Sequence, residues 1–335
     1  MASSILTSLR RAVTRRLRRS FIGGCAVFFF DNQLAKLRLV RGDIGTDSGA
    51  AHADWDVEDS LRYIRLVHGE YLEQAGVPGF FGRVAEVGPG DSCGVALLML
   101  ADGAEQVDLV DRFYSKRDQS YHQTVYRKLI EETPALLLAG YDADLGEDAF
   151  SGITRLYGDQ ASSEIFFLGR SGYDFIVSRA VMEHVTDPIL SLQRMADALK
   201  PGGRLLHVVD LRDHGMFTQY DFPELKFLGV PPLLYRQMTA ETGRPNRAPL
   251  RLYREAFPQA AFKVTHLVGY GHLPEPMAYN EIPPAVRSEA VAAVAAQRGL
   301  LHPSFRSEAD EDLAVSGFFM VFRKEEDAAP RAAAG

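Results

Sequence analysis

The chain has 335 residues, of which 46% are apolar and 24% charged, and this composition suits an α/β core with room for insertions. Its two cysteines, Cys25 and Cys93, exclude a disulfide framework and a cysteine metal cluster, and we predict no metal site. Nine basic residues and one acid precede Gly42, a net charge of +8, so with a total of −7 the rest of the chain carries about −15. This acidic body is a poor match for nucleic acid, whereas the N-terminal segment suits an anionic partner.

Residues 1–41 predict a basic amphipathic arm. Apolar positions over 4–20 follow the helical period with arginines on the other faces, and the apolar run at 21–30 is too short to span a bilayer. The pair Arg18-Arg19 resembles a twin-arginine export signal, but the apolar run is short and we identify no small-x-small cleavage site before Asp31. We therefore expect a cytoplasmic protein. Three roles stay open for the arm: packing on its own domain, a transit peptide, or peripheral contact of residues 4–30 with an anionic membrane.

A linker and one helix are expected between the arm and the core, over residues 42–79. Gly42–Ala53 is polar and glycine-rich, which predicts a linker. The apolar period that follows predicts a helix capped by Asp54 or Asp56. We expect the core to begin at residue 80.

A strand, a glycine turn and a helix are predicted within Arg83–Ala101. Val84–Val87 is typical of a short buried strand, Gly88-Pro89-Gly90 of a tight turn, and Cys93–Ala101 of an apolar helix. Free backbone N–H groups at the start of that helix can hold part of a cofactor, and the two glycines let the backbone approach it. Glu86 is an acid at an apolar strand end, which is costly unless the carboxylate has a partner.

The spacing of glycines and acids narrows the identity of the ligand. The dinucleotide fingerprint places its third glycine three residues after the second, whereas Gly94 follows Gly90 by four. The acid two residues before the first glycine suits a cation better than a pyrophosphate. A second strand, Gln106–Val110, ends in Asp111, and an acid at that place suits a ribose diol. A ligand that combines a cationic group with a ribose fits S-adenosylmethionine.

Four landmarks occur in order along the chain: Glu86-Val-Gly-Pro-Gly90, Asp111, Tyr173–Val185 and Leu199-Lys-Pro-Gly-Gly-Arg-Leu205. In this order and spacing the chain resembles a class I S-adenosylmethionine-dependent methyltransferase, well over residues 80–212 and poorly in the flanks. The resemblance implies an α/β fold with a seven-stranded, mostly parallel, doubly wound sheet and helical insertions after strands five and six. It also implies a cofactor-binding domain that extends over residues 80–324.

The resemblance further implies a site for S-adenosyl-L-methionine, which leaves as S-adenosyl-L-homocysteine. That site would combine the glycine turn, the acids after strands two and three, and the end of strand four. Its expected residues are Glu86 for the methionine amino group, Gly88, Pro89 and Gly90 as the wall, Asp111 for the ribose hydroxyls, Arg112 as a further cofactor-binding residue, Asp159 for the adenine amino group, and Ser178 and Arg179 at the ligand end of strand four. A helix cap is the alternative role for Asp159.

The other elements are predicted from the period of their apolar residues and from the turn and capping residues at their ends. Strands are expected at 153–157, 174–178, 204–210, 262–268 and 317–323, and helices at 116–132, 187–199 and 285–298. Residues 213–258 are rich in aromatics and prolines and are expected to form a cap over the acceptor site, with a second insertion at 272–315. By the resemblance, the last two strands pair as a hairpin. Residues 325–335 predict a disordered tail.

The expected chemistry is in-line transfer of the sulfonium methyl group to an acceptor. Ser178-Arg-Ala-Val181 is not the Pro-Pro-aromatic turn of enzymes that methylate nucleobase amines, and neither cysteine is placed for carbon-5 chemistry. The aromatic insertions suit a small-molecule, sugar or lipid-linked acceptor, methylated at oxygen ahead of nitrogen or carbon. His184 is the first candidate for a general base, and His214 and His272 follow. His207 lies inside a strand and is expected in the core.

Other functions stay open beside this one. The basic arm is compatible with a methyltransferase that modifies RNA. A nicotinamide-dependent oxidoreductase would use Asp111, but the glycine spacing and Glu86 argue against it. A binding protein that has lost turnover would keep the same motifs. The oligomeric state is not predicted.

Overall fold

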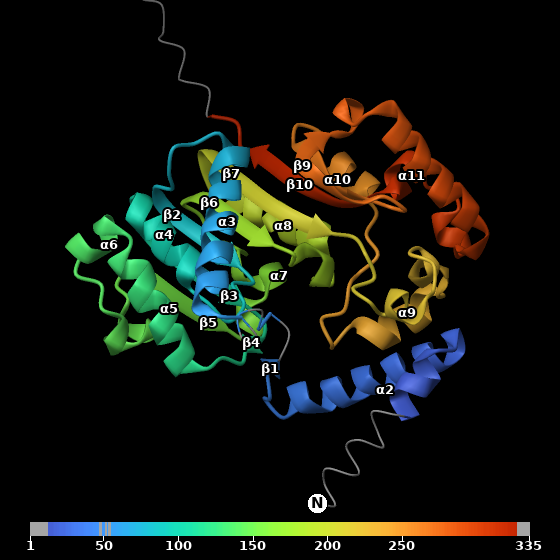
Figure 1. Cartoon of the computed structure of the whole chain (residues 1–335), viewed down its shortest axis with the longest axis horizontal. Coiled ribbons are helices and arrows are strands. Elements are labelled where there is room, and N and C mark those ends of the chain that lie inside the picture. Colours follow the sequence, from blue (N-terminus) through green and yellow to red (C-terminus); the bar gives the residue numbers. More distant parts are fainter. Residues whose placement is uncertain (1–12, 47–48, 51, 53–54, 327–335) are drawn as a thin grey trace, which may run out of the picture.

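The structure is a computed structural model that describes residues 13–46, 49–50, 52 and 55–326 (Figure 1). At its centre is an eight-stranded sheet with the strand order β5-β3-β2-β6-β7-β10-β8-β9. In that order the strands are Ile153–Tyr157, Ala104–Asp111, Gly82–Val87, Tyr173–Arg179, Leu199–Asp210, Val315–Arg323, Ala261–Leu267 and Gly271–Ala278. The strands from β5 to β7 are parallel to their neighbours, and β10, β8 and β9 pair antiparallel. The predicted α/β fold with a mostly parallel sheet is confirmed.

The sheet contains one strand that the sequence did not predict. All seven predicted strands are present, and the last two, β8 and β10, are antiparallel neighbours. The additional strand, β9, lies at the edge of the sheet and pairs with β8 alone. It contains Pro274 and Pro276, and proline residues make a strand unexpected when only the sequence is considered. An edge strand tolerates proline because its missing N–H groups can face away from the neighbouring strand.

Helices cover both faces of the sheet, because successive strand side chains point to opposite faces. Phe175 and Val177 pack beneath one group of helices, and Ile176 packs beneath the other. The first group comprises α3 (Val57–Ala75), α4 (Gly94–Asp102), α5 (Gln119–Glu131) and α6 (Pro134–Leu138). The second comprises α7 (Ser163–Phe166), α8 (Pro188–Ala198), α10 (Leu250–Ala256), α11 (Pro284–Gln297) and α12 (Asp310–Ala314). The sheet is therefore doubly wound.

The elements before the core also have a defined arrangement. Asp56 caps α3, accepting a hydrogen bond from the Asp59 backbone N–H at 2.8 Å. A small two-stranded sheet joins β1 (Gly45–Thr46) to β4 (Tyr114–Ser115), which ties part of the predicted linker to the core.

The helix α2 (Phe21–Val40) lies along one end of the molecule beside α9 (Pro232–Thr239), as Figure 1 shows. Its inner side packs on Phe217 of the 213–258 insertion, with the Phe28 and Phe217 ring centroids 5.6 Å apart. The predicted arm is thus helical well beyond residue 20. Residues 1–12 of the arm and 327–335 of the predicted tail lie outside the described residues.

Candidate functional site

A cavity of about 580 Å³ lies at the carboxyl ends of β2, β3 and β6. This edge is where open α/β sheets bind ligands. The cavity brings together six of the predicted site residues, Gly88, Pro89, Gly90, Asp111, Arg179 and His184. It is not lined by the other four, Glu86, Arg112, Asp159 and Ser178.

The glycine turn forms part of the cavity wall, and at its glycines only backbone atoms face the cavity. Gly88 and Gly90 both have a φ of +68°, in the left-handed region that favours glycine. A Cβ at Gly90 would lie 2.6 Å from the Gly49 carbonyl oxygen, which also accepts a hydrogen bond from the Asp91 N–H at 3.1 Å. The turn is therefore clamped against the linker, and a side chain at Gly90 would push the two backbones apart.

Asp111 lies at the end of β3 with its carboxyl at the cavity. Burial raises the pKa of Asp111 to about 6, and one oxygen accepts a hydrogen bond from the Phe113 N–H at 2.8 Å. A ligand hydroxyl would offer this buried carboxyl a further hydrogen bond. Asp159 is placed differently: its side chain is 77% exposed and forms an ion pair with Arg112 at 3.2 Å. The predicted adenine contact therefore has no support from the position of Asp159.

Glu86 lies behind the cavity rather than in its lining. It is buried, its Oε2 atom has no hydrogen-bond partner, and burial raises its pKa to about 8. Tyr63, which does line the cavity, is close enough for Glu86 to affect its titration. A cationic ligand group in this region would supply the partner that Glu86 lacks.

Ser178 belongs to the core instead of the cavity. It is fully buried and its hydroxyl shares a 2.7 Å hydrogen bond with Nδ1 of His207, itself fully buried as predicted. Strand alternation explains the difference, because Ser178 and Arg179 point to opposite faces of β6 and only Arg179 reaches the cavity. His272 lies on β9 against His266 and lines neither this cavity nor the neighbouring one described below.

A short turn at Met182–His184 brings His184 to the cavity. Asn246, from the 213–258 insertion, fixes that turn, because its side-chain amide donates to the Met182 carbonyl at 2.8 Å and to the Val185 carbonyl at 2.9 Å. Burial lowers the pKa of His184 to about 4, and the neighbouring His214 adds to this effect. His184 is therefore a neutral imidazole at neutral pH.

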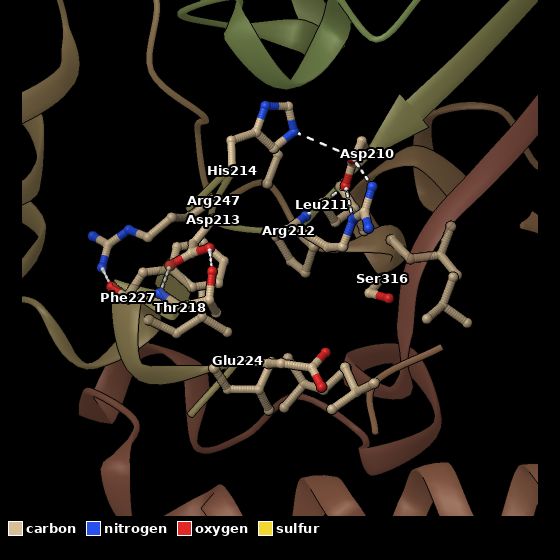
Figure 2. Close-up of a pocket in the computed structure, with 18 of the residues that line it drawn as sticks. Asp210, Leu211, Arg212, Asp213, His214, Thr218, Glu224, Phe227, Arg247 and Ser316 are labelled. Carbon is tan, nitrogen blue, oxygen red and sulfur yellow. Dashed lines mark hydrogen bonds and ion pairs between the residues drawn. The ribbon is translucent and has the colours of Figure 1, made fainter. Parts of the chain in front are cut away.

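His214 lies beside His184, with ring centroids 4.8 Å apart. Its Nε2 atom is 3.3 Å from Oδ2 of Asp210, at the end of β7, and Arg212 holds the same carboxylate (Figure 2). Burial opposes ionisation of Asp210, but hydrogen bonds from Arg212 and His214 outweigh it, so the pKa of Asp210 lies below its ordinary value. Asp210 is thus an anion that can orient the imidazole. The sequence named His214 as a candidate but did not pair it with Asp210.

Glu183 completes this cluster as a buried carboxyl group. Its Oε1 atom lies 3.7 Å from Nε2 of His214, and both of its carboxyl oxygens lack a hydrogen-bond partner. Potential metal-ligand atoms of Glu183, His184 and His214 lie within 4.8 Å of one another. Burial, however, raises the pKa of Glu183 well above its ordinary value and so disfavours its charged form. Hydrogen bonds lower the pKa of Asp210 instead, which favours Asp210 as the negative charge beside His214.

The backbone at this cluster is strained. His214 has a φ of +49° and Ala180 a φ of +53°, and both residues line the first cavity. Asp213 holds the His214 loop, because its carboxylate accepts from the backbone N–H groups of Phe217 and Thr218 at 2.7 and 2.9 Å. Left-handed φ values at residues other than glycine cost energy and concentrate at functional sites.

A second cavity, of about 610 Å³, adjoins the first and is shown in Figure 2. His214 lines both cavities and so marks their junction. The 213–258 insertion supplies much of the second lining, including Leu225, Phe227 and Leu228, and β10 supplies Val315. Glu224 and Arg247 add polar groups to this apolar space.

Removal of the Asn246 amide is expected to loosen the Met182–His184 turn. The Asn246→Ala variant loses three hydrogen bonds, the two donated to the turn and the one accepted from the Ala248 N–H, and should be destabilised by about 1–3 kcal/mol. Asn246→Asp keeps the acceptor for the Ala248 N–H but turns a carboxylate oxygen toward the Met182 and Val185 carbonyls, so it should be no more stable than the alanine variant. Thermal unfolding of the three proteins tests this, and a wild-type melting temperature in both variants would contradict it.

Comparison with known proteins identifies the family to which the chain belongs. A family model described as a methyltransferase domain matches residues 59–267, more than half of the chain. Similar solved structures include phosphoethanolamine N-methyltransferase 2 of Haemonchus contortus, 12% identical over 78% of this chain and 53% of that chain, with a TM-score of 0.39. YcgJ of Bacillus subtilis is 14% identical over 78% of this chain and 100% of that chain, with a TM-score of 0.39. None of the curated proteins matches the chain.

The family match, unlike these low structural similarities, decides the class of the protein. The matched region 59–267 contains the glycine turn, Asp111, His184 and His214. The cofactor is S-adenosyl-L-methionine, in place of the nicotinamide alternative. The chain belongs to the methyltransferase-domain family and is an S-adenosylmethionine-dependent methyltransferase.

Proposed function

We propose that this enzyme methylates a hydroxyl group of a small-molecule, sugar or lipid-linked acceptor. In this proposal the cofactor binds in the first cavity and the acceptor in the second. The observation that carries the proposal is the position of His214, which lines both cavities and lies 3.3 Å from the anionic Asp210. A base at the junction of two sites is suited to taking a proton from one ligand as that ligand reacts with the other.

The residues of the first cavity fit S-adenosylmethionine. Gly88 and Gly90 line the cavity with backbone, because a Cβ there would collide with Val181 or the Gly49 carbonyl, and the Asp111 carboxyl can accept from ribose hydroxyls. Glu86 has an unpartnered oxygen behind the cavity, which suits a cationic amino group. When bound, the cofactor supplies a methyl group already activated by its sulfonium.

His214 would act as the general base. Its Nε2–H can donate to Asp210, which leaves the lone pair of Nδ1 to accept the hydroxyl proton. Asp210 holds the ring in this tautomer and stabilises the imidazolium that forms. His184, the base candidate named from the sequence, is here a positioning residue, because it is neutral, largely buried and packed edge-on against His214.

The second cavity supports an acceptor smaller than a nucleic acid. Its apolar lining, with Leu225, Phe227 and Leu228, suits the apolar part of a small molecule. The net charge of about −15 outside the arm would repel an RNA substrate. These features favour the small acceptor over the RNA alternative.

Calorimetric titration with S-adenosylmethionine and S-adenosylhomocysteine, with NADH as a control, tests the cofactor site. Wild type should bind both sulfur ligands, and Asp111→Ala should lose about tenfold or more in affinity, because a buried carboxyl then no longer meets the ribose. A panel of hydroxyl and amine acceptors, read by mass spectrometry, then tests the methylated atom. Equal binding by the variant would remove Asp111 from the site, and N-methylation alone would overturn the hydroxyl proposal.

A further inference from the structure

The outward face of α2 carries a stripe of exposed apolar side chains. These are Ile22, 81% exposed, Phe30, 65%, Leu34, 50%, Leu37, 54%, and Val40, 80%. Their spacings of three, four and eight residues place them along one side of the helix, and we call them the outer stripe. A row of exposed apolar side chains along one helix is a candidate binding surface.

The fold does not need the outer stripe to hold α2 in place. The opposite side of the helix is buried through Cys25, Phe28 and Asn32. Phe28 packs edge-on against Phe217, and the Asn32 side chain accepts from the Glu241 N–H at 2.8 Å. The helix is thus anchored from within, and its outer stripe is left for another partner.

The charges around the stripe are cationic. Six exposed basic residues belong to α2 or flank it: Arg15, Arg16, Arg19, Lys36, Arg38, which pairs with Asp43, and Arg41. The one acid of the first 41 residues, Asp31, pairs with Arg18 at 3.1 Å and with Arg244 at 3.5 Å. Since the rest of the chain carries a net negative charge, this cationic surface is the one that we expect to attract an anionic partner.

We propose that α2 docks on an anionic lipid bilayer, with the outer stripe buried among the headgroups and acyl chains. An apolar face flanked by lysine and arginine is the pattern of helices that lie in the membrane interface. Within the described residues no helix is both long and apolar enough to cross a bilayer, so the contact is interfacial. RNA would leave the apolar stripe uncovered, and a second copy would bring two cationic arms together.

Docking through α2 would place the cofactor cavity next to the membrane. Ala35, Arg38 and Leu39, on the inner side of the same helix, line that cavity. This step rests on the proposed function, and it selects the lipid-linked acceptor among the proposed classes. Such an acceptor could keep its apolar tail in the bilayer while its polar head reaches His214.

Sedimentation of the full-length protein with vesicles tests the docking. Vesicles of phosphatidylcholine, with and without about 30% phosphatidylglycerol, distinguish an anionic surface from a neutral one. The test variant Phe30→Glu/Leu37→Glu adds two charges to the outer stripe. The control Leu138→Glu/Leu168→Glu adds the same charges at leucines that are 90% and 65% exposed, on and near other helices.

Wild type and the control should bind the anionic vesicles at least about tenfold better than neutral ones, and the test variant should lose about tenfold or more. Absence of wild-type binding, or equal binding by both variants, would overturn the proposal. A wild-type dimer that the test variant dissociates, without vesicle binding, would assign the stripe to a second copy. S-adenosylmethionine titration of the same samples is an independent readout, so failure of docking and failure of the proposed chemistry are distinguishable.

Discussion

A His214→Asn enzyme is expected to lose about 10²- to 10⁴-fold in kcat and to keep its affinity for S-adenosylmethionine. The asparagine cannot take the acceptor proton, whereas the glycine turn and Asp111 are untouched. Asp210→Asn should also lower kcat, because the imidazole loses the anion that orients it. Steady-state kinetics with a hydroxyl acceptor, together with calorimetry for the cofactor, measures both effects.

Two other histidines serve as controls for this prediction. His272→Asn removes an imidazole that lines neither cavity, so its kcat should match that of wild type. His184→Asn should lower kcat less than His214→Asn, since His184 acts by positioning its neighbour. A His214 variant with wild-type kcat, or a larger loss at His184, would return the base assignment to His184.

The Glu86→Gln variant is expected to be more stable than wild type at alkaline pH when no cofactor is present. Burial raises the pKa of Glu86 from 4.5 to about 8, so the folded protein holds a proton that the unfolded chain releases between these values. The free energy of unfolding therefore falls as pH rises through this window, by about 5 kcal/mol at most from this group. Glutamine removes the effect, and denaturant unfolding at pH 5 and pH 9 measures it.

The same substitution should weaken cofactor binding. In wild type, affinity for S-adenosylmethionine should rise with pH up to about 8 as Glu86 ionises beside the cationic amino group. In Glu86→Gln the affinity should be about tenfold lower and lose this pH dependence. Glu73→Gln, an exposed acid on α3, is the control and should behave as wild type. Unchanged binding by Glu86→Gln would mean that Glu86 only shapes the turn.

Features that depend on a few neighbouring residues could be predicted from the sequence. Most of the seven predicted core strands are apolar runs bounded by turn residues, and the resemblance to the methyltransferase family implied the doubly wound sheet. The glycine turn was also predictable, because its backbone conformation excludes side chains locally. Asp111 was also predictable from its neighbours in the sequence. It directly ends a predicted strand and so lies at the ligand-binding edge of the sheet.

Other features depended on contacts between distant segments. Ser178 and Arg179 are neighbours in sequence, but packing of β6 against β7 decided that Ser178 pairs with His207 while Arg179 reaches the cavity. Asp159 follows its strand as expected, yet its exposed position and its partner Arg112 were set by the loops around it.

The sequence by itself determined a doubly wound methyltransferase core, with a glycine turn after the first core strand and an acid at the end of the second. Only the tertiary structure brought His214 to Asp210 and to the junction of two cavities, and only the packing of α2 on Phe217 and α9 decided which side of α2 stays exposed. The physical reason is the separation along the chain of the residues that interact. Strand periodicity and glycine conformation are properties of adjacent residues, whereas side-chain direction at a site is decided by packing between segments that the chain brings together from far apart.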